Sequence, residues 1–392
     1  MTPVVWRRAW RWCCLLGLWA LTGCTGGPGG APGPGYYWQS VTGHLALVQA
    51  ARPVDEWLSD PATPPALKDR LVLAQRMRRF AVTELALPDN ASYTRYADLK
   101  RRAAVWNVVA APEYSLTLQT WCYPLLGCAG YRGYFNEAEA EAFAARLRAQ
   151  GLEAVAYPVP AYSTLGWTNW LGGDPLLNTF VGHTEGELAR LLFHELSHQV
   201  VYASDDTLFN ESFATAVERL GGQRWLAAQA SPAARVAYAE FDGRRQQFRE
   251  LTRRTRENLN KIYAQSQHGK AGAAIEIDDF MAARKAAAMA EFHQRYEELK
   301  ASWGGHNGYD AWVARANNAT FGVQAAYDDL APAFEALFRR QGCRFSAFYD
   351  AVRGLAAQPK AQRHQALQDE LARQSIPASG ASPCGPPPPD PR

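Results

Sequence analysis

The stretch LLFHELSHQVV, residues 191–201, places His194, Glu195 and His198 among apolar residues. The spacing of these apolar residues predicts a core helix over about residues 185–203. A buried helix face excludes charged and polar side chains unless each of them has a partner. Because residues four apart lie on one face of a helix, both imidazoles can reach a single ion. The pattern therefore predicts a metal ion as the partner.

The order His-Glu-x-x-His on a helix is typical of zinc hydrolases. We expect His194 and His198 to be ligands of one Zn²⁺ ion, because neutral imidazole nitrogens suit this metal. Glu195 is then the catalytic general base, which accepts a proton from the attacking water. The alternative interpretation is two hydrogen-bonded core histidines beside a surface glutamate.

A catalytic zinc site usually has three protein ligands, so one more is needed. After a break at SDD, a second helix is predicted over 207–220, ended by Gly221-Gly222. Glu211 and Glu218 lie on it, about 10.5 Å apart along the axis. We choose Glu211 as the third ligand, because the turn returns it beside His198, and place Glu218 behind the ligands or at the surface. The weaker candidates, more typical of a helix cap, are Asp205 and Asp206.

The N-terminus predicts export. Three arginines precede the apolar run WCCLLGLWAL, which is short for a membrane span and is followed by Leu-Thr-Gly-Cys. This ending resembles the lipobox of bacterial lipoproteins, which implies a signal peptide over 1–23 and lipidation of Cys24. The resemblance also implies an outer-membrane lipoprotein facing the periplasm, because Thr25 rather than Asp follows. The alternative is an ordinary signal peptide with a chance cysteine.

The remaining chain divides by composition. Residues 24–35 form a flexible Gly/Pro tether, and residues 375–392 form a disordered Pro-rich tail. Residues 36–374 are expected to be a single domain, with a catalytic core (36–230), a helical hairpin (231–305) and a helical C-terminal part (306–374). The net charge of +3 equals the three arginines of the signal, so the mature chain is near neutral and nucleic-acid binding is not supported.

Four cysteines remain after the signal and the lipidation site. Cys122 and Cys128 are separated by five residues, which is too wide for a zinc knuckle. In an exported protein this spacing predicts a small disulfide loop. Cys343 and Cys384 could form a second bridge, which the sequence alone leaves open.

The pattern of elements predicts an α+β fold with a small, mostly antiparallel sheet and a largely helical C-terminal half. Apolar periodicity indicates helices near 38–51 and 65–86, and residues rich in β-branched and aromatic types indicate strands between them and the metal helix. Asn136 begins another helix that Gly151 ends. Two long charged helices, 233–266 and 274–302, are expected to form the hairpin.

His194-Glu195-x-x-His198 followed by Asn210-Glu211 resembles the gluzincin metallopeptidases, although twelve residues between His198 and Glu211 are fewer than in thermolysin-like enzymes. WNVVAAPEYSL, WCYPLLGCAGYRGYF, AYSTLGW, FNESFATAVERLGG and NNATFGVQAAYDDL resemble a bacterial lipoprotein-like family named putative aminopeptidases, over most of residues 36–345. The resemblance implies a zincin-like core and removal of N-terminal residues from peptides. AYSTLGW would be an edge strand that holds the substrate main chain. Tyr162 would then face the cleft, or be a tyrosine of the core or of the sheet edge.

Three functions follow from these patterns. The first is a membrane-anchored zinc aminopeptidase that acts on peptides. The second is a zinc endopeptidase with the same centre and a cleft open at both ends. The third is a non-catalytic lipoprotein that binds a partner through the helical hairpin. The sequence does not indicate an oligomeric state.

Overall fold

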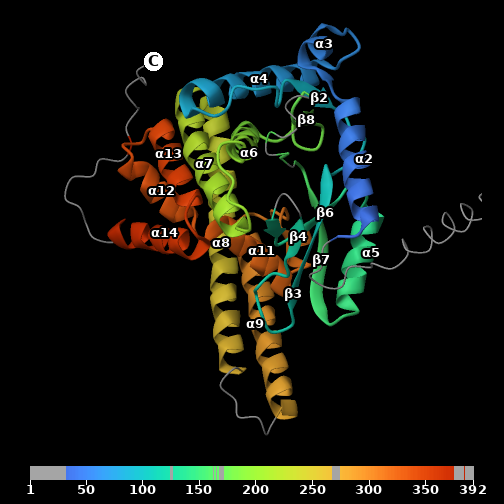
Figure 1. Cartoon of the computed structure of the whole chain (residues 1–392), viewed down its shortest axis with the longest axis vertical. Helices are drawn as coiled ribbons and strands as arrows, with labels where there is room; N and C mark the ends of the chain where they lie inside the picture. The colour runs from blue at the N-terminus through green and yellow to red at the C-terminus, as the bar shows by residue number, and fades with distance from the viewer. Residues whose placement is uncertain are drawn as a thin grey trace, which may run out of the picture.

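The computed structural model describes residues 32–123, 127–161, 163, 164, 166, 172–266, 274–374 and 384. It is a mixed α/β fold, mostly helical with small sheets (Figure 1), as the sequence pattern predicts. The signal peptide, Cys24, Tyr162, the turn of the hairpin, most of the tether and all of the tail except Cys384 lie outside the described residues. No helix within these ranges is both long and apolar enough to cross a bilayer.

The main sheet has three antiparallel strands in the order β6-β3-β7. Their bounds are Arg132–Tyr134 for β6, Val105–Pro112 for β3 and Leu152–Val159 for β7. Helix α5 (Glu137–Arg148) packs on one face and α11 (Asn318–Asp328) packs on the other. Because both faces are covered, β3 is apolar along almost its whole length rather than alternating.

Two smaller sheets flank the main one. The first has the order β1-β2-β8, with β1 antiparallel and β8 parallel to β2. Its strands are Arg52–Pro53, Arg95–Ala97 and Leu176–Leu177. The second is a two-stranded antiparallel hairpin of β4 (Trp121–Tyr123) and β5 (Gly127–Ala129).

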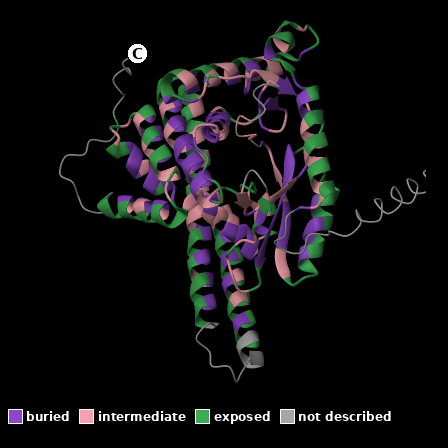
Figure 2. Cartoon of the chain, in the orientation of Figure 1, coloured by how far each residue is buried: buried purple, intermediate pink, exposed green. Residues whose placement is uncertain are grey.

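Helices α6 (Glu185–Ser197) and α7 (Thr207–Ala228) lie side by side at the centre of the helical part, and Figure 2 shows how fully they are buried. Their apolar side chains share one core with α4 (Pro65–Leu85) and with the C-terminal helices. The C-terminal helices are α12 (Ala331–Arg340), α13 (Phe345–Ala356) and α14 (Lys360–Gln374). The remaining short or peripheral helices are α2 (Pro34–Ala50), α3 (Val54–Ser59) and α10 (Asp310–Val313).

Two long helices, α8 (Pro232–Ser266) and α9 (Ala274–Ser302), run beside each other and project from the molecule (Figure 1). An apolar cluster that includes Phe248, Ile262 and Phe292 joins them to each other. The two helices of the hairpin therefore lie where the sequence predicts them, and their outer faces carry charged residues in solvent.

Two helix boundaries differ from the sequence prediction. The helix that carries His194 ends at Ser197 rather than near residue 203, because the chain turns back at once toward α7. Helix α7 does not end at Gly221-Gly222 but continues to Ala228. A Cβ on Gly221 would lie 2.7 Å from Leu85 and 3.0 Å from Phe193, and one on Gly222 would lie 2.8 Å from Arg190. The two glycines therefore permit close helix packing instead of ending the helix.

The structure differs from the predicted edge strand AYSTLGW, residues 161–167. Strand β7 ends at Val159, and the described residues of AYSTLGW are not in a strand. Pro160 has no N–H to continue a ladder. Thr164 instead bonds to Asp174, donating from its backbone nitrogen (3.1 Å) and its hydroxyl (2.8 Å). Strand β7 is itself an edge of the main sheet.

Candidate metal centre

Helix α6 positions the two histidines. It begins with a reciprocal cap between Thr184 and Glu187, as expected when a threonine is followed three residues later by a glutamate. His194 lies in its last turn. His198 is the C-cap residue and keeps helical dihedral angles, φ −60° and ψ −19°, so it still lies one turn above His194. The Nε2 atoms of the two imidazoles are 3.3 Å apart.

A short connection brings Glu211 to the same point. Asn210 holds the connection by bonding to both the N–H and the carbonyl oxygen of Ala203, each at 2.8 Å. Asp206 caps α7 by accepting a hydrogen bond from the N–H of Phe209, and its other described contacts include His364 and Arg363 of α14 rather than His194 or His198. The chain thus reverses between α6 and α7, and Glu211, the fifth residue of α7, faces the last turn of α6.

Three ligand atoms converge. Oε2 of Glu211 is 3.3 Å from Nε2 of His194 and 3.7 Å from Nε2 of His198. The ligand atoms of these three residues all lie within 4.8 Å of one another, and the residues are buried. Two imidazole nitrogens and a carboxylate oxygen are a donor set that zinc takes in hydrolases. The arrangement therefore fits a zinc ion held by His194, His198 and Glu211.

Glu218 contacts the other side of the same imidazole. Its Oε2 is 3.1 Å from Nδ1 of His194, so the ring of His194 lies between Glu211 and Glu218. Seven residues are almost two helical turns, so both carboxylates lie on one face of α7. Glu218 also pairs with Arg190 and, at 2.9 Å, with Arg245. A carboxylate on the second nitrogen of a ligating histidine fixes its tautomer and ring orientation.

The site favours positive charge where the ligand atoms meet. Burial disfavours a charged His194, but hydrogen bonds to Glu211 and Glu218 outweigh it and raise its pKa to about 10. Burial lowers the pKa of His198 to about 4, which leaves that imidazole neutral. Burial opposes ionisation of Glu218, yet Arg190 and Arg245 hold its pKa well below the usual value. The carboxylates therefore favour a positive charge at this point, which a metal ion bound to neutral His194 would supply in place of the proton.

Glu195 differs from the other carboxylates. Burial raises its pKa to about 7, and the charges of Glu211, Asp174 and Glu218 add to this effect. His194 opposes the shift. A carboxyl group poised near neutral pH is able both to accept and to return a proton. Glu195 therefore has the proton affinity that a general base requires.

Three tyrosines surround the carboxylates, and the sequence patterns did not single them out. The Tyr327 hydroxyl donates to Glu211, and its ring stacks on His194 with centroids 6.1 Å apart. Tyr157 lies in β7 and Tyr131 directly precedes β6, and both interact with the negative charge of Glu211. Burial raises the pKa of all three, to about 12 for Tyr157 and well above the usual value for the others. They remain protonated donors, and only the fold brings them together.

A cavity of about 1040 Å³ adjoins the centre, and His194, Glu195 and Glu218 form part of its wall. Strand β7 lines it with Val155 and the segment 157–159, opposite residues of α8, α10 and α11. The main chain of β7 is hydrogen-bonded to β3 on one side, and in the described residues no strand pairs with its other side. An extended peptide can add to such an edge.

Several other polar residues lie near the site or away from it. Glu185 accepts a hydrogen bond from Trp225, whereas His183 and Glu187 line the cavity. Asn317 caps α11, and Asn318 is buried against the carbonyls of Pro112 and Glu113. Asp205 contacts the disulfide hairpin rather than the ligand atoms. Tyr162 lies outside the described residues.

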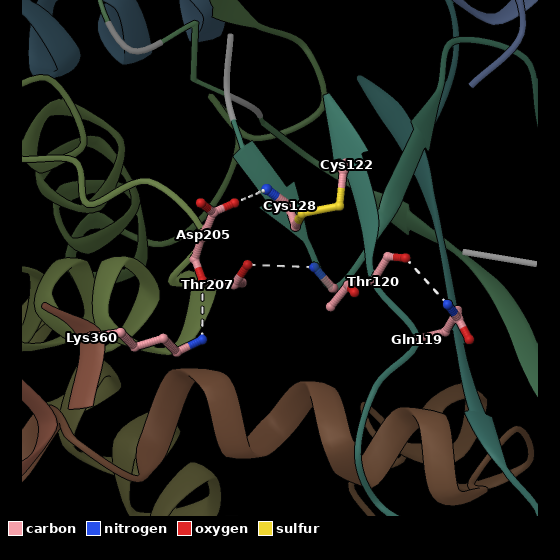
Figure 3. Close-up of a disulfide and its surroundings, with 8 residues drawn as sticks. Gln119, Thr120, Cys122, Cys128, Asp205, Thr207 and Lys360 are labelled. Atoms are coloured by element: carbon pink, nitrogen blue, oxygen red, sulfur yellow. Dashed lines mark hydrogen bonds between the residues drawn. A yellow bond between two sulfur atoms is a disulfide. The ribbon is translucent and has the colours of Figure 1, made fainter. Parts of the chain in front are cut away.

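The hairpin of β4 and β5 is closed by a disulfide between Cys122 and Cys128 and rests on the start of α7 (Figure 3). The N–H of Cys128 donates to Asp205 at 2.5 Å, and the N–H of Gly130 donates to Thr207 at 3.4 Å. The hairpin thus holds the turn that precedes Glu211. A second disulfide joins Cys343 to Cys384 and ties one residue of the tail to the helical core.

Replacing both Cys122 and Cys128 with serine should lower the free energy of unfolding by about 2–3 kcal/mol at most, because so short a loop restricts the unfolded chain little. Urea unfolding followed by circular dichroism measures the change, and mass spectrometry of non-reduced peptides should identify the linked pair in the wild type. Alkylation of both cysteines in the unreduced wild-type protein would contradict the bridge.

Comparison with known proteins gives one result. The family model described as "Putative aminopeptidase" matches residues 35–367, which include every ligand and catalytic candidate above. No curated protein and no solved structure matches the chain. The family name suggests a peptidase, a hydrolase of peptide bonds, and the matched region covers most of the sequence. On this evidence the chain belongs to the putative aminopeptidase family.

Proposed function

We propose that this protein is a zinc metallopeptidase that removes N-terminal residues from peptides, with a zincin-like catalytic core. The observation that carries the proposal is the convergence of His194, His198 and Glu211 beside Glu195 in the wall of a cavity. When bound, a zinc ion supplies a Lewis acid that polarises a carbonyl and lowers the pKa of water.

Glu195 is adjacent to a ligand without being one. Because neighbouring residues on a helix are rotated by about 100°, its carboxylate points past the ligand atoms toward the cavity. There it accepts the proton of the attacking water and returns it to the leaving amine. Its raised pKa suits both transfers.

The remaining residues bind and orient. Glu218 holds the imidazole of His194 through Nδ1, and the Tyr327 hydroxyl holds Glu211. The free edge of β7 is placed to pair with the main chain of an extended substrate. Glu187 and Glu240 line the same cavity and offer carboxylates to a substrate ammonium.

Purified protein should hydrolyse peptides that have a free N-terminus, lose this activity with a chelator and regain it with zinc. N-acetylation of the same peptides should abolish cleavage, since an aminopeptidase needs the free ammonium group. Product analysis by mass spectrometry measures both effects. Rapid cleavage of the acetylated peptides would identify an endopeptidase instead, and failure to cleave either set would favour a binding protein.

We also propose that the chain is anchored to the outer membrane, facing the periplasm, by a lipid on Cys24. This rests on Leu-Thr-Gly-Cys and the following tether. The wild type should incorporate labelled fatty acid and enter the detergent phase, whereas Cys24→Ser should remain unlipidated, because the thiol is the acyl acceptor. Recovery of unlabelled wild type as a free periplasmic protein would contradict the anchor.

A further inference from the structure

Helix α2 has one face packed against the protein and one face left open. Tyr36, Gln39, Gly43 and Leu47 lie on the inner face: Gln39 bonds to Gly133 and Phe135, and a Cβ on Gly43 would overlap the ring of Phe135. The opposite face points away from the rest of the described chain, as the exposed residues along α2 in Figure 2 show.

The open face is apolar. Trp38 is 73% exposed, Val41 55%, Leu45 40% and Tyr37 37%. At 100° per residue these four side chains fall within about 100° of the helix circumference. The described chain has eight large hydrophobic residues that are exposed, and four of them thus lie within the nine-residue stretch 37–45. Single exposed apolar residues are ordinary, but a contiguous apolar face marks an interaction site.

The helix also lacks charge. Its sequence, PGYYWQSVTGHLALVQA, has no aspartate, glutamate, lysine or arginine. A face exposed only to water gains solubility from charged side chains, and every other surface helix longer than α2 carries them. Tryptophan and tyrosine prefer the boundary between lipid headgroups and acyl chains, where an apolar ring and a polar N–H or O–H are both satisfied.

The position of α2 in the sequence indicates what covers its open apolar face. Nine Gly/Pro-rich residues separate Pro34 from Cys24, the proposed lipidation site. This composition predicts a random coil with a root-mean-square span of about 17 Å. A lipid on Cys24 would therefore hold α2 close to the bilayer surface.

We propose that the outer face of α2 lies in the interfacial layer of a phospholipid bilayer. The helix then lies along the membrane, with Trp38, Val41 and Leu45 among the headgroups. This contact adds buried apolar area to that of the proposed lipid anchor. It also fixes which side of the protein faces the membrane. The proposed orientation of α2 on the membrane rests on the proposed lipid anchor at Cys24. It does not rest on the proposed peptidase activity.

The test uses the mature chain from Thr25, which contains every described residue but no lipid, in flotation with vesicles of phosphatidylethanolamine and phosphatidylglycerol. Wild type should bind, and the triple variant Trp38→Gln, Val41→Gln, Leu45→Gln should bind at least about tenfold more weakly. The matched control, Val72→Gln, Val236→Gln, Phe280→Gln, removes three exposed apolar residues of α4, α8 and α9 and should bind like wild type.

Thermal unfolding of both variants checks that they fold, and exposed substitutions should change it little. Absence of wild-type binding, or equal loss in both variants, overturns the proposal. Sedimentation that shows a wild-type dimer and a monomeric α2 variant also overturns it, because the face is then an interface between copies. The assay involves neither Cys24 nor peptide hydrolysis. A negative result would therefore contradict the membrane contact of α2 without contradicting the proposed lipid anchor or the proposed peptidase activity.

Discussion

The Glu195→Gln protein should retain stoichiometric zinc and lose about 10²–10⁴-fold in kcat on peptides with a free N-terminus. Glutamine keeps the size of the side chain but cannot accept a proton. The described carboxylate contacts of the His194 imidazole come from Glu211 and Glu218 rather than Glu195, so metal binding should be unchanged. Zinc analysis by atomic absorption, together with initial rates, separates the two effects.

A suitable control for this variant is Glu240→Gln, which changes another carboxylate in the cavity wall but lies far along the chain from the ligands. It should retain zinc, and any effect should appear in KM rather than in kcat, because a group that holds the substrate ammonium contributes to binding. Hydrolysis at the wild-type rate by Glu195→Gln would remove the proposed role of this residue.

The second large effect concerns the metal. His194→Ala, His198→Ala and Glu211→Ala should each fail to retain stoichiometric zinc after dialysis, because each removes one of three converging ligand atoms. Metal analysis and competition with a chromogenic chelator measure the loss. Activity should fall with the zinc content, and added zinc should not restore it at moderate concentration.

Glu218→Gln provides the matched comparison, because it lies on the same helix and contacts the same imidazole at Nδ1. Loss of such a supporting carboxylate typically weakens metal binding by about 10–100-fold, so most of the zinc should remain at saturating metal. Glutamine also keeps an oxygen for Arg190 and Arg245, whereas alanine would leave both guanidinium groups without this partner. If Glu218→Gln loses the metal and Glu211→Ala keeps it, the assignment of the third ligand is wrong.

The sequence by itself determined the local features of the site. Four-residue spacing on an apolar helix places His194 and His198 on one face whatever surrounds them, and a helix cap needs only neighbouring residues, as at Asn136. The same is true of the long hairpin helices, whose periodicity extends over many turns. These signals depend on the chain within a few residues, so they can be read without the fold.

Tertiary structure decided how far the elements extend. Gly221-Gly222 is a helix-ending pattern in isolation, but it lies inside α7 because Leu85, Phe193 and Arg190 pack where side chains would otherwise be. Strand β7 ends at Val159 because Pro160 cannot extend the ladder and Thr164 bonds to Asp174 instead. Packing and long-range hydrogen bonds override local propensity in both cases.

Tertiary structure also decided the surroundings of the ligands. Arg245 pairs with Glu218, 27 positions earlier in the chain, and Glu218 in turn contacts His194. Tyr327 lies on α11, which begins 90 residues after the end of α7. No local pattern marks these residues, because their roles depend on distances across the fold. The sequence therefore determined which side chains can bind a metal. The packing of α6, α7, α8 and α11 determined which other side chains surround these ligands, shift their pKa values and hold them in place.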